Sequence, residues 1–139
     1  MSSNQKQNVL FLCTHNSCRS QMAEGLLRDL YGSSYNSFSA GIIKSSVHPL
    51  AIEVMDEIGV DISNQSSKNI DVYTGMVFDY VITVCDNAKE QCPFFPGKRI
   101  LHQNFPDPSS VQVSYEEQIQ LFRETRDAIK QWIQDTFSR

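Results

Sequence analysis

Apolar residues along the chain fall alternately into short continuous runs and into helical repeats. Residues 8–13 (NVLFLC) form one apolar run that stops at a polar loop, which predicts a buried strand. Within residues 22–31 the apolar positions recur every three or four residues and end before Gly32, which predicts an amphipathic helix. The chain is therefore predicted to open with a strand, a polar loop and a helix.

The same alternation continues to the end of the chain. Residues 35–40 and 80–85 predict two more strands, the second apolar on nearly all positions, and residues 99–101 predict a short edge strand. Helices are predicted over residues 49–58 and 114–137, the latter opened by a Ser-x-x-Glu capping box. This order predicts an α/β fold with a four-stranded parallel sheet flanked by helices.

Two connecting segments carry candidate chemistry. Residues 86–97 contain Cys92 followed by Pro93 and Pro96, and prolines so placed discourage regular structure. We expect this segment to be a long mobile loop. Residues 105–108 predict a turn that contains Asp107.

Length and composition limit the possible classes of protein. The 139 residues and 15.8 kDa suit one domain over residues 1–139. Twelve basic against sixteen acidic residues give a net charge of −4, which argues against binding to nucleic acid. No apolar run approaches the roughly 18 residues of a membrane span. We expect a cytoplasmic monomer without a membrane segment, in which the four cysteines are reactive, metal-binding or buried thiols rather than a disulfide framework.

Two of these cysteines end predicted strands. Cys13 closes the first strand and Cys85 closes the third along the chain. In open parallel sheets, ligands bind outside the carboxyl ends of the strands. If the two strands are neighbours in the sheet, two cysteines far apart in sequence meet at one site.

The loop after the first strand has the chemistry of an anion site. Cys13 and Arg19 are separated by five residues in a loop that leads into a helix. Backbone N–H groups at a helix N-terminus attract anions, and the arginine fork matches two oxygens of a tetrahedral oxyanion. The same field favours the thiolate of Cys13, and the Ser20 hydroxyl is a further donor to that sulfur. The candidate oxyanion-binding residues are Thr14, His15, Asn16, Ser17, Cys18, Arg19 and Ser20.

Two members of this loop have a simpler interpretation as well. His15 would then be a spacer that faces solvent, and Cys18 a thiol packed beneath the loop. For Cys18 the packed interpretation is preferred.

Residues 9–25 (VLFLCTHNSCRSQMAEG) resemble the CX5R phosphate-loop signature of low-molecular-weight protein tyrosine phosphatases. They resemble more closely the thioredoxin-coupled arsenate reductases that share this fold. Phosphatases of this fold usually have a proline after the arginine-serine pair, whereas the reductases have the run that stands here as residues 20–24 (SQMAE). Residues 38–41, 61–63 and 107–108 also resemble the family, so the similarity covers nearly the whole chain.

Residues 85–93 (CDNAKEQCP) are similar to the redox segment of these reductases, in which six residues separate two cysteines. The resemblance implies that arsenate is reduced to arsenite by a relay of Cys13, Cys85 and Cys92, and that thioredoxin regenerates the enzyme. Reduction of arsenate needs two electrons, which two additional thiols can deliver. Arg19 and a general acid at Asp107 would complete the catalytic set, and phosphate and sulfate would compete as oxyanions.

Other functions stay open at this point. A tyrosine or small-ester phosphatase would use the same loop. However, Ser109 and Ser110 follow the Asp-Pro pair, where phosphatases tend to carry aromatic residues, which favours small oxyanions. A thiol sensor or a zinc module is a third class, but the spacing of Cys85 and Cys92 lies outside the usual zinc pattern. We therefore expect neither a metal nor another cofactor.

One position departs from the resemblance. Some reductases of this family hold a potassium ion with residues that match Asn16, Glu24, Ser39 and an aspartate, but Lys68 stands at the aspartate position here. An ammonium group there would repel a cation or take its place, which argues against a dependence on potassium.

Overall fold

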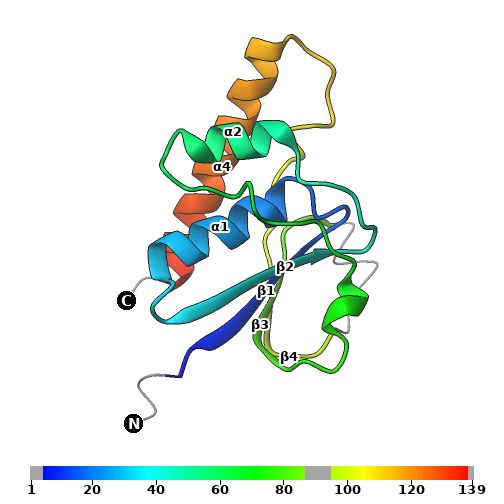
Figure 1. Cartoon of the computed structure of the whole chain (residues 1–139), viewed down its shortest axis with the longest axis vertical. Coiled ribbons are helices and arrows are strands. Elements are labelled where there is room, and N and C mark those ends of the chain that lie inside the picture. Colours follow the sequence, from blue (N-terminus) through cyan, green and yellow to red (C-terminus); the bar gives the residue numbers. More distant parts are fainter. Residues whose placement is uncertain (1–4, 87–94, 138–139) are drawn as a thin grey trace.

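The computed structural model describes residues 5–86 and 95–137. Its four strands form one parallel sheet in the order β2-β1-β3-β4 (Figure 1). The strands are β1 (Gln7–Cys13), β2 (Tyr35–Gly41), β3 (Phe78–Thr83) and β4 (Gly97–His102). The predicted α/β fold with a four-stranded parallel sheet is confirmed.

The helices of the described residues lie mainly on one side of this sheet. Helix α1 packs on β1, β2 and α4, and α2 packs on α4 (Figure 1). The helices are α1 (Arg19–Tyr31), α2 (Pro49–Asp56), the short 3-10 helix η2 (Ile70–Tyr73) and α4 (Tyr115–Phe137). None of the helices in the described part of the chain is both long and apolar enough to cross a membrane.

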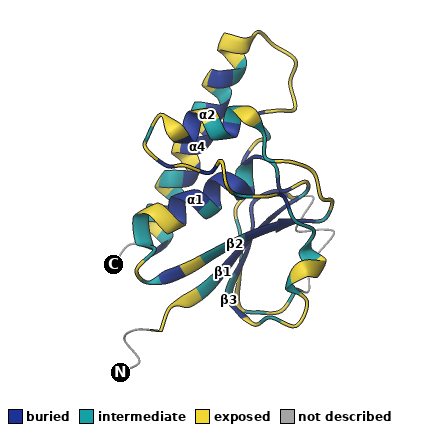
Figure 2. Cartoon of the chain, viewed as in Figure 1, coloured by how far each residue is buried: buried dark blue, intermediate teal, exposed yellow. Residues whose placement is uncertain are grey.

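The apolar run of the first strand forms the centre of the core. β1 lies between β2 and β3, and the side chains of residues 9–12 are buried (Figure 2). Burial of each such side chain contributes about 1.5–3 kcal/mol. Because of this burial, displacing β1 would cost much free energy, and the loop that follows it starts from a fixed point.

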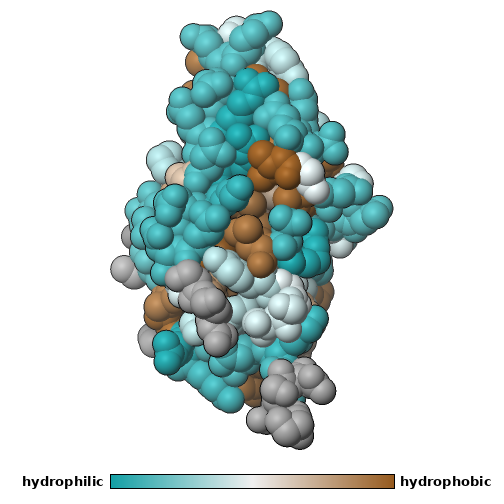
Figure 3. Space-filling model, turned by 90° about the vertical axis from the view of Figure 1, so that its left-hand side faces the viewer, coloured by the Kyte–Doolittle hydropathy of each residue, from teal (hydrophilic) through white to brown (hydrophobic). Residues whose placement is uncertain are grey.

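Figure 3 shows a mostly hydrophilic face with hydrophobic side chains gathered near its middle.

Aromatic rings cover both faces of the sheet. Tyr35 and Tyr80 pack edge-on against Phe137 at the end of α4, with ring centroids 5.0 and 5.2 Å from that of Phe137. Phe38 of β2 points to the opposite face of the sheet from Tyr35. Its ring packs against that of Tyr73 in η2, with 5.6 Å between the ring centroids. Alternate residues of one strand thus hold α4 on one face and η2 on the other.

The structure differs from the predicted boundaries at several points. β3 ends at Thr83, so Cys85 lies two residues beyond the strand, although Val84 N still donates to Leu12 O (2.9 Å). α1 begins three residues earlier than the apolar repeat because the polar residues of its first turn are buried against the loop. α2 ends at Asp56 instead of residue 58, β4 is longer than predicted, and η2 has no apolar pattern that would reveal it.

The other terminal signals are confirmed. Ser114 N donates to Glu117 Oε1 and Glu117 N donates to Ser114 Oγ, both at 3.2 Å, which is the predicted capping box. The turn expected over residues 105–108 is displaced along the chain: it starts at Asp107, whose carbonyl accepts from Ser110 N at 3.2 Å. The expected mobile loop falls largely on residues 87–94, which lie outside the described residues, as does Cys92.

Gly41, the last residue of β2, makes a close approach to the polar loop. It pairs with Cys13, and a Cβ atom at this position would lie 2.8 Å from Asn16 N and 2.9 Å from Thr14 O. These are backbone atoms, which cannot move aside as a flexible side chain can. The loop therefore needs a glycine here.

We expect Gly41→Ala to lower the free energy of unfolding by about 1–3 kcal/mol and to displace the loop. Phosphate should then protect Cys13 from alkylation less well. Urea unfolding and alkylation rates measure the two effects. Gly25→Ala is the matched control, because its Cβ would meet only side chains, the nearest being Ile62 Cγ2 at 2.5 Å. It should alter stability but not phosphate protection; equal loss of protection in both variants would contradict the assignment.

Candidate active site

The loop between β1 and α1 surrounds a small polar cavity of about 240 Å³. The loop begins at the buried end of β1 and ends at the first residues of α1, whose N-terminal N–H groups point toward the loop. The residues that line the cavity are Cys13, His15, Ser17, Cys18, Arg19, Ser45, Asp107 and Ser109. A cavity of this size and polarity suits a small anion.

A buried hydrogen-bond network holds the sulfur of Cys13. Ser20 Oγ lies 2.8 Å from Cys13 Sγ, and Asn16 Nδ2 donates to Ser20 Oγ at 2.7 Å. Because Asn16 already donates to this hydroxyl, the hydroxyl hydrogen of Ser20 is available to the sulfur. The expected contact between Ser20 and Cys13 is therefore present, and either atom is able to donate in it.

Asn16 fixes the loop through its own side chain. Its backbone has φ of 52°, in the left-handed region that asparagine tolerates better than most residues. Its Oδ1 accepts from Lys68 N (2.9 Å) and its Nδ2 also donates to Ser39 Oγ (2.9 Å). Gln21 Nε2 donates to the Asn16 carbonyl at 3.0 Å. The side chain of Asn16 therefore organises the loop from beneath rather than lining the cavity.

The same network ends at a carboxylate. Ser39 Oγ donates to Glu24 Oε1 at 2.5 Å. Burial raises the pKa of Glu24 above its usual value, although Ser39, Lys68 and Arg28 act in the opposite direction. These groups do not suit a potassium ion, because Asn16 and Ser39 already satisfy each other and the charge of Lys68 opposes a cation near Glu24.

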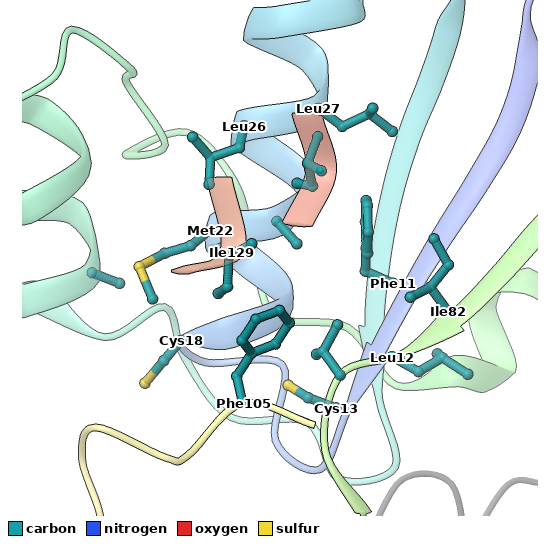
Figure 4. Close-up of a cluster of buried hydrophobic side chains, with 14 of the residues drawn as sticks. Phe11, Leu12, Cys13, Cys18, Met22, Leu26, Leu27, Ile82, Phe105 and Ile129 are labelled. Carbon is teal, nitrogen blue, oxygen red and sulfur yellow. The ribbon is translucent and has the colours of Figure 1, made fainter. Parts of the chain in front are cut away.

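Arg19 and Asp107 approach the cavity from different segments. Arg19 Nη1 donates to Phe105 O at 2.8 Å, and Nη2 lies 3.8 Å from Asp107 Oδ2. Figure 4 shows the Phe105 ring entering the cluster of buried side chains near Cys13. Phe105 thus anchors the segment that carries Asp107 to the core.

The pKa of Asp107 lies below its usual value. Burial alone would raise this pKa, but hydrogen bonds from the side chain and backbone of Ser109 lower it, as do the charges of Arg19 and His15. Ser109 Oγ and Ser109 N donate to Asp107 Oδ1 at 2.7 and 2.9 Å. Asp107 is therefore ionised at neutral pH while the cavity holds no anion.

Cys85 lies beside the loop, as the sheet topology requires. β1 and β3 are neighbours, with Leu12 paired to Thr83, and Cys85 Sγ lies 3.4 Å from Thr14 Oγ1. Both Cys85 and Cys13 are buried. The two strands are neighbours, as the hypothesis requires. Cys85 is not among the residues that line the cavity, so its meeting with Cys13 at one site stays a prediction.

Cys18 is a different kind of thiol. It is buried, and burial raises its pKa to about 12. Figure 4 shows it at the start of α1, separate from Cys13 at the end of β1. Cys18 is therefore protonated at neutral pH. It is buried, as the packed interpretation expects, but it also lines the cavity. His15 is exposed and lines the cavity as well.

The cavity does not include every residue expected at the oxyanion site. Thr14, Asn16 and Ser20 are not among the lining residues, because their side chains turn toward Cys85, the buried network and Cys13. These three residues can therefore contact an anion only through their backbone N–H groups. Ser45 lines the cavity and was not expected, since it lies in a loop without a motif; only its place after β2, at the carboxyl edge of the sheet, indicates it.

Within residues 5–86 and 95–137, no group of three or more histidine, cysteine, aspartate or glutamate side chains has the arrangement of a metal site.

Comparison with models of known protein families identifies the family of this chain. The family model described as low molecular weight phosphotyrosine protein phosphatase matches residues 8–139. The chain belongs to this family. This assignment agrees with the resemblance of residues 9–25 to the phosphate-loop signature of that family.

Individual relatives of the chain are named arsenate reductase. The chain is 43% identical over 125 residues to a protein of Halalkalibacterium halodurans named arsenate reductase, covering 89% of this chain and 90% of that one. A solved structure titled "An arsenate reductase in oxidized state" matches with a TM-score of 0.80 and 31% identity over 93% of this chain and 95% of that one. A thioredoxin-dependent arsenate reductase of Corynebacterium glutamicum matches with a TM-score of 0.67 and 34% identity, over 96% of this chain and 64% of that one.

We expect Ser109→Ala to raise the pKa of Asp107, because the variant removes the hydroxyl that donates to the carboxylate. NMR titration of the Asp107 carboxyl carbon measures the midpoint. Ser110→Ala is the matched control, since Ser110 Oγ donates to the backbone carbonyl of Asp107 at 2.9 Å and not to the carboxylate. A midpoint that moves equally in both variants, or in neither, would show that Ser109 does not set the charge of Asp107.

Proposed function

We propose that this chain is an arsenate reductase, which converts arsenate to arsenite through three cysteines and is regenerated by thioredoxin. One observation carries the proposal: a second buried thiol, that of Cys85, lies beside the loop that holds Cys13, with its sulfur 3.4 Å from Thr14 Oγ1. Hydrolysis of a phosphate ester needs one nucleophile and an acid, and has no use for this thiol. The names of the curated and structural relatives support the same reading.

In the first step, arsenate binds in the loop against the Arg19 guanidinium and the backbone N–H groups. Arg19 reaches the anion by giving up its 3.8 Å approach to Asp107. The Cys13 thiolate, to which Ser20 donates, attacks arsenic, forms a sulfur–arsenic bond and displaces one oxygen. That oxygen leaves as water once it is protonated.

Asp107 is the proposed donor of that proton. Its pKa is low in the anion-free site, so the acid form needs the substrate. A bound oxyanion brings negative charge next to the carboxylate and draws Arg19 away, and both changes raise the pKa of Asp107. Asp107 then carries a proton only when an anion occupies the cavity, which confines the acid to productive complexes.

In the second step, the Cys85 thiolate attacks Cys13 Sγ. A sulfur–sulfur bond forms, the sulfur–arsenic bond breaks, and arsenic keeps the electron pair and leaves as arsenite. The two thiols have supplied two electrons, so arsenic falls from the +5 to the +3 state. The neighbouring ends of β1 and β3 support this step, because they bring the two cysteines to the same edge of the sheet.

In the third step, the Cys92 thiolate attacks Cys85 Sγ and releases Cys13 as a thiolate. A Cys85–Cys92 disulfide remains, which the two thiols of thioredoxin reduce. The thioredoxin-dependent relative from Corynebacterium glutamicum supports this choice of reductant. For this step the segment that holds Cys92 has to bring its sulfur to Cys85.

The second candidate function is a phosphatase of low molecular weight, because the chain belongs to that family. Two features argue against phosphotyrosine as the main substrate. The cavity is small, and Ser109, which follows the Asp-Pro pair, lines it in place of an aromatic wall. Small oxyanions such as phosphate and sulfate would then compete with arsenate.

We further propose that the protein acts as a monomer in the cytoplasm. The relay needs reduced thiols at rest. A reducing compartment maintains that state.

A single turnover of the reduced protein with arsenate, followed by disulfide mapping, tests the relay. We expect the wild type to finish with a Cys85–Cys92 disulfide. Cys92→Ser should stop at a Cys13–Cys85 disulfide and lose turnover with thioredoxin by at least ~100-fold, while hydrolysis of an aryl phosphate persists because it needs only the loop and the acid.

Gln91→Ala is the matched control for this test, because it changes the same segment without removing a thiol. It should give the wild-type disulfide. Arsenite release without any disulfide, or aryl phosphate hydrolysis without arsenite formation, would refute the reductase and favour the phosphatase.

A further inference from the structure

One imidazole ring bridges the residues on both sides of Cys85. His102, the last residue of β4, places Nδ1 2.7 Å from Thr83 Oγ1 and Nε2 2.8 Å from Asp86 Oδ1. Thr83 ends β3, and Asp86 follows Cys85 directly. The ring therefore spans the short stretch of chain that carries the second thiol of the site.

The backbone after β4 supports the same stretch. Gln103 N donates to Thr83 O at 3.0 Å and Phe105 N donates to Val84 O at 3.1 Å. Asn104 Oδ1 accepts from Asp86 N at 3.1 Å. Backbone contacts thus hold the chain before Cys85, and the side chains of His102 and Asn104 contact Asp86, the last described residue after it.

The chemistry of the three partners sets the role of each ring nitrogen. An ionised Asp86 only accepts, so Nε2 of His102 carries a hydrogen and donates to it. The Thr83 hydroxyl both donates and accepts, so it pairs with Nδ1 whether or not that nitrogen is protonated. Both hydrogen bonds consequently persist in either charge state of the ring. The bridge therefore acts by holding the backbone in place and not by transferring a proton.

We propose that His102 is a positioning residue for Cys85. By joining Thr83 to Asp86 it holds the backbone so that the Cys85 sulfur faces Thr14 and the loop of Cys13. This inference rests on the proposed relay, in which Cys85 attacks Cys13. Attack of one sulfur on another needs close alignment, and a misplacement of about 1 Å can cost ~100-fold in rate.

The test measures the attack of Cys85 by itself. In a Cys92→Ser background, reduced protein is mixed with arsenate, and formation of the Cys13–Cys85 disulfide is followed in a single turnover. We expect His102→Ala to slow this step by ~10–100-fold. Protection of Cys13 by phosphate against alkylation should stay as in the parent, because the anion loop is unchanged. The loss should be similar above and below the pH at which free histidine titrates.

Two variants of Asp86 separate positioning from a general loss of structure. The Asp86 side chain is 70% exposed, so Asp86→Ala breaks the bridge from its outer end with little effect on folding, and it should slow the same step. Asp86→Asn keeps an oxygen that accepts from Nε2 and should restore most of the rate. Gln103→Ala changes an exposed neighbour outside the bridge and should match the parent.

Alkylation of Cys85 in the absence of arsenate gives a second readout. Cys85 is 3% exposed, and loss of the bridge should make it react several-fold faster. If the parent forms no Cys13–Cys85 disulfide, the relay is wrong. The alkylation rate of Cys85 then still tests whether His102 positions this residue. Unchanged disulfide formation in His102→Ala and Asp86→Ala, or unchanged alkylation of Cys85 where no disulfide forms, would overturn the role of His102.

Discussion

The parallel pairing of β1 with β3 is the constraint on which the site depends. It buries the apolar run of β1 in the middle of the sheet and brings the carboxyl ends of both strands to one edge. The loop of Cys13 and the stretch that carries Cys85 then leave the sheet side by side. Neither thiol can move far without breaking contacts in the core, so the rigid sheet supplies the alignment and the loops supply the polar groups.

Around this edge, three other segments support or line the site. The end of β2 contributes the close approach of Gly41, the segment after β4 contributes Phe105 and Asp107, and α1 contributes Arg19 and Ser20. Each segment is tied to the core by at least one buried contact. The result is a small polar site whose members come from distant parts of the sequence but are fixed to a common frame.

The sequence predicted the elements that have a strong apolar period. The central strands were found because burial leaves a repeated pattern. The capping box of α4 and the loop between Cys13 and Arg19 were found because particular residue types stand at fixed spacings. Ser20 and Gln21 belong to α1, yet they are buried among polar contacts and leave no such pattern. The pattern over residues 80–85 also ran past the end of β3, because Val84 and Cys85 are buried without belonging to the ladder. Ser45 and the bridge made by His102 depend on tertiary proximity that no local signal encodes.

The network beneath the loop has a fixed direction. Asn16 presents only hydrogens to Ser20 and Ser39. Ser39 donates its own hydrogen to Glu24, and Ser20 Oγ lies 2.8 Å from the Cys13 sulfur, where either atom is able to donate. Lys68 N holds the opposite end of the amide and prevents it from turning over. A proton on Glu24 therefore has no conducting path to the sulfur, and the two acidic groups are insulated from each other although only three side chains separate them.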